Sequence, residues 1–176
     1  LMKSNLSKIM DWVFISEGGY AERDSEPGGA VNMGISFTSY KDWCKKKNRP
    51  DPTFADLKEM QRSEAEGIYF EGFFKPINFD TQQSGVDYAY VDFAVNSGVG
   101  GSTRAIQREL KFPVTGKVDA KFMWALKSRN PIVLIDAICD ARIKLSMKSK
   151  NWERFKDNWT RRVDKVRSRA KQLVVE

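Results

Sequence analysis

The chain has 176 residues, a net charge of +7 and an isoelectric point near 9.4. This length suits one domain, or one lobe with a small second lobe, and it is sufficient to bury a core. The chain contains no histidine, which excludes Ser-His-Asp and Cys-His nucleophile systems and the His-bearing zinc sites of hydrolases. We expect no metal ion and no cofactor. Cys44 and Cys139 either form one disulfide or remain buried thiols, and their spacing does not decide between the two.

The positive charge is concentrated at one end of the sequence. From Ala141 to Glu176 there are twelve Lys or Arg against four Asp or Glu, a local excess of +8 that accounts for the whole net charge. Such a segment can bind nucleic acid, an anionic membrane face or an anionic wall polymer, although a solvated helix face is the simpler interpretation.

No targeting or membrane segment is evident. No run of about 18 apolar residues predicts a transmembrane helix. The first residues lack the apolar segment of a signal peptide, and the sequence begins with Leu1. We therefore expect that a leader was removed or that Leu1 remains from a tag.

The first predicted element is an amphipathic helix whose last turn carries Glu17. Apolar residues recur at helical spacing before it, and the Gly18-Gly19 pair predicts its end. The helix C-terminus is the negative end of the macrodipole and disfavours an ionised carboxylate, as does an apolar wall from Tyr20. This environment is typical of a general acid, and the alternative is a solvent-facing Glu at a frayed helix end.

The segment from Ala21 to Ile35 is rich in Gly, Pro, Asp and Glu, and it predicts a loop or a short hairpin. It carries three carboxylates, Glu22, Asp24 and Glu26. A Ser63 to Glu66 capping box predicts a further helix that runs to about Phe74 and is ended by Pro76.

The rest of the chain is predicted to be helical. Amphipathic patterns predict helices over residues 37–47, 56–60, 87–96, 102–110, 120–127, 132–148 and from 152 onward. Because no convincing alternating strand pattern occurs, the predicted fold class is mainly α.

A set of glycine-containing motifs points to a family. Glu17-Gly18-Gly19-Tyr20, Pro27-Gly28-Gly29 and Gly34-Ile35-Ser36 together resemble the signature of the muramidases of glycoside hydrolase family 108. The resemblance implies a lysozyme-like helical fold with Glu17 as the catalytic acid.

The second half is similar to the predicted peptidoglycan-binding region of the same family. The matching segments are 91–98, 105–110 and 115–119, with Phe155, Trp159, Arg162 and Val163 in the last helix. The resemblance implies a catalytic lobe over residues 1–80 and a helical lobe over residues 81–176, packed as one unit.

Two of the departures from the family pattern bear on the expected chemistry. Glu26 stands where the family usually has Asp, and Val31 stands where it usually has Thr. In phage-type lysozymes a Thr near the second carboxylate helps to hold the attacking water, and Val forms no hydrogen bond. The way in which water is positioned is therefore open.

Glycosidic bond cleavage usually needs two carboxyl groups, about 5 Å apart for retention and roughly 6.5 to 9.5 Å apart for inversion. With Glu17 as the acid, Glu26 is the first candidate for the second role because it precedes a Pro-Gly-Gly turn. Asp24 is the second candidate and Glu22 the third. If none of them reaches the substrate, a single acid can still act as in lytic transglycosylases, which release an anhydro-sugar.

Three residues are predicted to bind substrate. Tyr20 is either a stacking platform for a sugar or a core residue. Asn32 and Asn96 are candidates to hydrogen-bond sugar groups, and the alternative for Asn96 is a helix-capping role.

The expected function is that of an N-acetylmuramidase that cleaves the β-1,4 bond between N-acetylmuramic acid and N-acetylglucosamine. The expected partner is the glycan strand of peptidoglycan, and no specific nucleic-acid ligand is expected. We expect the protein to be a monomer that is secreted or exported to the periplasm or cell wall. A wall-binding protein without catalysis and a nucleic-acid-binding protein are the alternatives. The sequence does not decide whether acetylated or deacetylated glycans are preferred. It also does not decide whether the protein is a phage endolysin, a secreted bacterial enzyme or a toxin.

Overall fold

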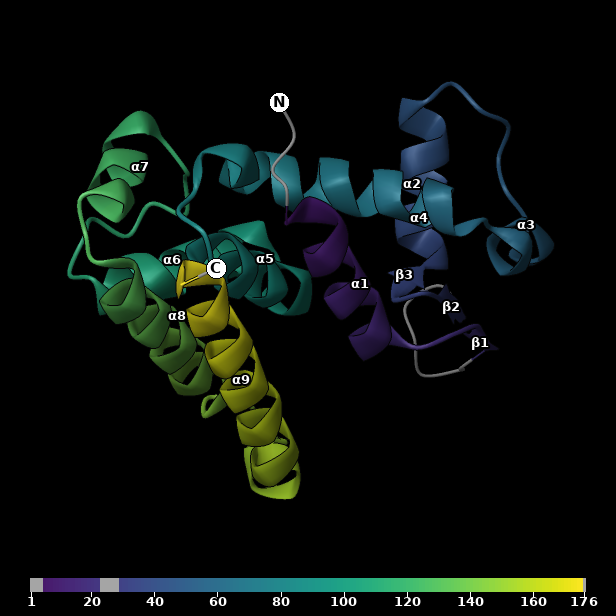
Figure 1. The fold of residues 1–176 in the computed structure, drawn as a ribbon. Coiled ribbons are helices and arrows are strands. Elements are labelled where there is room, and N and C mark those ends of the chain that lie inside the picture. The colour runs from purple at the N-terminus through teal and green to yellow at the C-terminus, as the bar shows by residue number, and fades with distance from the viewer. Residues whose placement is uncertain (1–4, 23–28, 176) are drawn as a thin grey trace. The chain divides into compact units, whose positions relative to one another are not determined.

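The structure, a computed structural model, describes residues 5–22 and 29–175. The chain forms two compact units, Leu1–Gly72 and Phe73–Glu176. Helices make up most of both units, and the first also contains a small antiparallel sheet (Figure 1). The predicted mainly helical fold, with a hairpin after the first helix, is therefore confirmed. The predicted catalytic lobe over residues 1–80 and helical lobe over residues 81–176 stay a prediction.

Helix α1 (Leu6–Glu17) follows the predicted pattern. Its apolar face includes Ile9 and Val13, which are fully buried. It ends at Glu17 because Gly18 adopts φ 78° and ψ −170°, a conformation that is almost restricted to glycine.

A three-stranded sheet follows α1, in the order β1 (Ala21–Glu22), β2 (Ala30–Asn32) and β3 (Ile35–Ser36). Asn32 pairs with Ile35, so the turn between β2 and β3 consists of Met33 and Gly34 alone. Both turn residues have positive φ, 47° and 75°, as a type I′ hairpin turn requires. The sequence predicted a single hairpin at most, and the third strand was missed because its two residues are too few to show a pattern.

Three helices complete the first unit: α2 (Phe37–Lys46), α3 (Phe54–Glu59) and α4 (Arg62–Tyr69). The predicted capping box at Ser63 is wrong, because α4 already begins at Arg62 with Gln61 as its N-cap. The Glu66 side chain accepts a hydrogen bond from Arg62 Nε at 2.9 Å instead of reaching back along the helix.

The chain continues past α4 through a π-helical turn, η1 (Phe70–Phe74), and two 3-10 turns, η2 (Lys75–Ile77) and η3 (Phe79–Thr81). Pro76 does not stop the helix as predicted. It lies in the first turn of η2, where a missing N–H costs nothing.

The second unit is organised around α5 (Val86–Ser97), against which α6 (Val99–Glu109), α8 (Pro131–Ser146) and α9 (Trp152–Val175) pack. The shorter α7 (Ala120–Lys127) precedes α8. Every residue from Val86 to Ala94 is buried, so α5 is a central helix and not the amphipathic one that its sequence predicted. Helix α6 begins at Val99, three residues before the predicted Ser102, whose hydroxyl bonds to the carbonyl of Gly98 at 2.8 Å.

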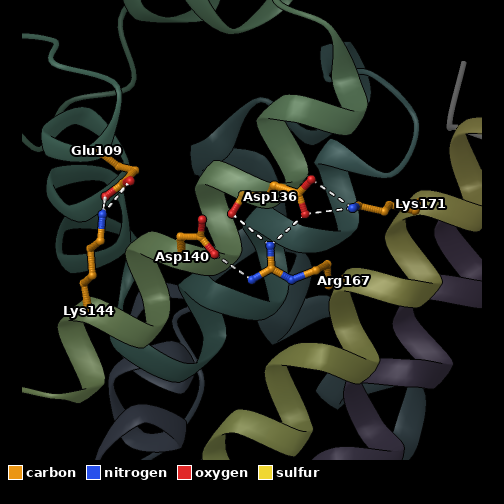
Figure 2. Close-up of polar contacts among 6 residues, drawn as sticks. All are labelled: Glu109, Asp136, Asp140, Lys144, Arg167 and Lys171. Atoms are coloured by element: carbon orange, nitrogen blue, oxygen red, sulfur yellow. Dashed lines mark hydrogen bonds and ion pairs between the residues drawn. The ribbon is translucent and has the colours of Figure 1, made fainter.

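Ion pairs join α8 to its neighbours (Figure 2). Arg167 on α9 bonds to Asp136 and Asp140 on α8, each at 2.7 Å, and Lys171 bonds to Asp136 at 2.9 Å. Lys144 on α8 bonds to both carboxylate oxygens of Glu109 on α6 at 2.7 Å. Part of the basic segment therefore holds the helices of this unit together.

Cys44 and Cys139 are free and buried, so the thiol alternative holds. Burial raises the pKa of the Cys139 thiol to about 12, which keeps it protonated at neutral pH. Within residues 5–22 and 29–175, no helix has both the length and the apolar character needed to cross a membrane.

Candidate active site

A cavity of about 480 Å³ opens at the C-terminal end of α1. It is lined by Glu17, Gly18, Gly19, Tyr20, Ala21, Val31 and Gly34. Glu17 is half-buried at its edge, on the last residue of the helix. The helix end and the first two strands thus bring one carboxyl group to an open hollow that a substrate can enter.

The β2–β3 turn fixes the position of the Glu17 side chain. A Cβ atom on Gly34 would lie 2.8 Å from Glu17 Cβ and 3.0 Å from Glu17 Cγ, so the turn backbone packs directly on this side chain. Tyr69 Oη donates a hydrogen bond to the carbonyl oxygen of Met33 at 2.9 Å, and the Tyr69 ring lies 5.1 Å from the ring of Phe14 on α1. Glu17 is therefore held between its own helix and a turn that α4 supports.

Sequence reasoning quoted Gly34 as part of a motif but did not give it this packing role. It missed Tyr69, because only the folded chain brings the end of α4 beside the turn.

Tyr20 lines the cavity and is half-buried. Its hydroxyl donates a hydrogen bond to Glu22 Oε1 at 2.6 Å, and this bond is the main reason that the pKa of Tyr20 is raised. Lys58 Nζ lies 5.5 Å from the centre of the Tyr20 ring. The ring is thus fixed on one side by a carboxylate and covered by a cation, while part of its surface borders the cavity.

The two predicted asparagines lie elsewhere. Asn32 is buried, and its Nδ2 donates to the carbonyl oxygens of Leu57 at 2.8 Å and Lys58 at 3.3 Å. These bonds fasten β2 to α3, and a sugar contact through Nδ2 would have to replace them. Asn96 belongs to the second unit, where it is exposed and lines a different cavity.

The model of the glycosyl hydrolase 108 family matches residues 10–98, which include the last eight residues of α1, the sheet and the whole lining of this cavity. The chain belongs to glycosyl hydrolase family 108. It is also similar to a solved structure of SagA from Brucella abortus, at 31% sequence identity and a TM-score of 0.85. That comparison covers 98% of this chain and 97% of the SagA chain. No curated protein sequence matches the chain.

As a member of family 108 the protein is a glycoside hydrolase, and the family supports peptidoglycan as its substrate. The family model ends at Gly98, one residue before α6. The predicted peptidoglycan-binding role of the remaining helices therefore stays a prediction.

The predicted second carboxylates divide into two groups. Asp24 and Glu26 lie outside the described residues. Glu22 is exposed on β1, where it bonds to Tyr20. Val31 lies on β2 and lines the cavity, so its side chain adds apolar surface there and no hydrogen-bonding group.

Proposed function

We propose that the protein is an N-acetylmuramidase that hydrolyses the β-1,4 bond between N-acetylmuramic acid and N-acetylglucosamine, with Glu17 as the general acid. The observation that carries this proposal is the placement of Glu17, the glutamate of the family motif, at the edge of the α1 cavity. The same substrate implies that the protein acts outside the cytoplasm, at the cell wall.

The surroundings of Glu17 suit proton donation. Its carboxyl group is on the last residue of α1 and lines the cavity. The close contact with Gly34 restricts the directions in which the side chain can point. A proton donor must be held within hydrogen-bond reach of the leaving oxygen, and such restriction provides this.

In the proposed reaction the Glu17 carboxyl group gives its proton to the glycosidic oxygen as the bond to the anomeric carbon breaks. A second carboxylate either attacks that carbon or takes a proton from a water molecule that attacks it. We assign this second role to Glu26 first and to Asp24 next. Glu22 ranks third because its carboxylate already accepts the Tyr20 hydroxyl.

The test is mass spectrometry of the soluble products released from purified peptidoglycan by the wild-type protein and by Glu17→Gln. Glu59→Gln is the matched control, because Glu59 is an exposed carboxylate of the same unit outside the cavity lining. Both substitutions remove one negative charge, so a general charge effect would appear in both.

We expect reducing muramic acid ends from the wild type and from Glu59→Gln, and a loss of at least about 100-fold in Glu17→Gln, as for removal of a general acid. Anhydro-muramic ends would show that the protein catalyses the transglycosylase reaction and not hydrolysis. If soluble products are absent while the protein still binds to sacculi, the proposed catalysis is refuted and the wall-binding alternative is favoured. Glu26→Gln and Asp24→Asn, measured in the same assay, rank the candidates for the second carboxylate.

A further inference from the structure

Lys58 places a cation at the border of the α1 cavity, and the proposed hydrolysis gives this residue no role. It lies near the end of α3, and its side chain is exposed. Its Nζ atom lies 5.5 Å from the centre of the Tyr20 ring, and Tyr20 lines the cavity. The ammonium group is therefore close to any molecule that occupies the cavity beside this ring.

The backbone of Lys58 is held against the strand that forms one wall of the cavity. Asn32 on β2 donates hydrogen bonds to the carbonyl oxygens of Leu57 at 2.8 Å and Lys58 at 3.3 Å. Leu57 is fully buried and anchors α3 in the core of the first unit. Val31, the neighbour of Asn32 on the same strand, lines the cavity. Lys58 is therefore carried on a fixed backbone, and only its flexible side chain has to move to contact a ligand.

The Lys58 ammonium is available for a stronger partner than the Tyr20 ring. It has three N–H donors, and an exposed contact with an aromatic face stabilises a cation only weakly. Among residues 5–22 and 29–175, no Asp or Glu forms an ion pair with it. The nearby Glu22 carboxylate instead accepts the Tyr20 hydroxyl at 2.6 Å, which holds the ring in place. A carboxylate brought by a ligand can thus pair with Lys58 without displacing a carboxylate of these described residues.

The other charges at the cavity oppose an anionic ligand. Among the described residues that line it there is no Lys or Arg, while Glu17 lines it and Glu22 bonds to Tyr20. A negative group beside Tyr20 meets the Glu22 carboxylate, and like charges a few ångströms apart repel. Lys58 offsets this repulsion because its ammonium lies over the same ring. A neutral group in this place gains no such attraction, so Lys58 favours ligands that carry a carboxylate.

We propose that Lys58 binds a carboxylate on the side chain of muramic acid and so determines which glycans the protein prefers. The muramic acid in this proposal rests on the proposed function, which supplies the substrate. Its carboxylate has two sources, the lactyl group of a muramic acid without peptide and the stem peptide that is attached to the lactyl group. Glycans built from N-acetylglucosamine alone carry neither of them and gain nothing from Lys58.

The experiment is isothermal titration of the full chain with four disaccharides at one low ionic strength. N-acetylglucosaminyl-N-acetylmuramic acid carries the lactyl carboxylate, and its methyl ester lacks that charge. The same disaccharide with an alanyl-glutamate peptide on the lactyl group carries the carboxylates of the stem. N,N′-diacetylchitobiose has no carboxylate.

Lys58→Gln is the test variant, and it keeps the backbone carbonyl to which Asn32 donates. Lys46→Gln is the matched control, because Lys46 is an exposed lysine of the same unit, on α2, and does not line the cavity. Both substitutions remove one positive charge. Lys58→Arg retains the charge and the N–H donors, and circular dichroism confirms that each variant is folded.

We expect the acid or the peptide form to bind about three- to fivefold more tightly than the methyl ester and diacetylchitobiose, since one ion pair near the protein surface supplies this factor. Lys58→Gln should abolish the preference, while Lys46→Gln and Lys58→Arg should keep it. The form that is preferred identifies the source of the carboxylate.

The proposal is overturned if neither the acid nor the peptide form binds more tightly than the ester, including the case in which no disaccharide binds. It is also overturned if Lys46→Gln and Lys58→Gln weaken the preference equally, which would show an effect of general charge alone. None of the four disaccharides contains a bond from muramic acid to a following N-acetylglucosamine, which the proposed activity breaks. A failure of that activity would therefore leave the titration result unchanged.

Discussion

Replacing Gly34 by Ala should destabilise the protein more than any other single glycine substitution around the α1 cavity. The added Cβ would overlap the hydroxyl of Tyr69 and would lie 2.8 Å from Glu17 Cβ. Gly34 also has φ 75°, which L side chains rarely adopt. The substitution therefore combines backbone strain, steric overlap and disturbance of the bond from Tyr69 to the carbonyl of Met33.

The neighbouring glycines separate these effects. Gly18 has φ 78° but nothing within 4 Å of an added Cβ, and Gly19 has neither the positive φ nor a close neighbour. We expect Gly19→Ala to change the free energy of unfolding by no more than about 0.5 kcal/mol. Gly18→Ala should cost about 1–3 kcal/mol through strain alone.

For Gly34→Ala the contributions are about 1–2 kcal/mol for the left-handed backbone, about 1–3 kcal/mol for overlap and about 1 kcal/mol for the Tyr69 hydrogen bond. The expected total of about 3–6 kcal/mol is a large part of the stability of a typical domain.

Urea unfolding, monitored by circular dichroism, gives the free energy of unfolding of the three variants under the same conditions. The double variant Gly34→Ala with Tyr69→Phe removes one overlapping atom, so its cost should be smaller than the sum of the two single costs. If Gly34→Ala is no more destabilising than Gly18→Ala, or if the double variant is additive, the packing of the turn on Glu17 and Tyr69 is refuted.

Two further substitutions test the second unit. Burial raises the pKa of Asp136, but the hydrogen bonds from Lys171 and Arg167 outweigh burial and lower it. The ionised carboxylate of Asp136 therefore stabilises the folded protein above the pKa of the unfolded state, near 4, and this stabilisation is lost as the pH falls through the pKa of the folded state. Asp136→Asn should therefore lower the free energy of unfolding by no more than about 1 kcal/mol at pH 7, because the Asp136 side chain is 38% exposed. If the urea curves of the wild type and the variant differ as much at pH 2.5 as at pH 7, this reasoning is contradicted. Gln107 is buried, and its Oε1 accepts hydrogen bonds from the backbone N–H groups of Thr115 and Gly116. Gln107→Leu should therefore lower the free energy of unfolding by about 2–4 kcal/mol. A loss below about 1 kcal/mol in the same assay would show that these bonds are not needed.

The parts of the site that depend on neighbouring residues were predictable from sequence. The periodicity of α1 and the glycine pair after it predicted Glu17 in the last turn of a helix, and the structure places it on the last residue. The glycine-rich segment predicted a loop or a short hairpin, and the structure has a small antiparallel sheet. Both features are set by a few consecutive residues, through helical spacing and through the positive φ that glycine accepts.

Features that depend on distant contacts were not predictable. The pattern of α5 suggested one apolar face, but three other helices surround it, and Asp92 inside it is accommodated only because Arg142 and Arg162 approach from α8 and α9. Asn32 was predicted to bind substrate, and its hydrogen bond to the carbonyl oxygen of Leu57 on α3 could not be seen in the sequence. In both cases a polar side chain in the sequence has a partner that no local pattern reveals.

The basic segment shows why net charge alone is a poor guide to ligands. The sequence places an excess of +8 between residues 141 and 176, which suggested nucleic acid among other partners. In the fold, Arg167, Lys171 and Lys144 are each paired with carboxylates of the same unit, and such pairs weaken the field that a distant polyanion would meet. Asp92 shows the converse case, because this one buried carboxylate pairs with Arg142 from α8 and lies 3.5 Å from Arg162 on α9. The charge counted along the sequence therefore overstates the field that this unit offers to a polyanion such as nucleic acid.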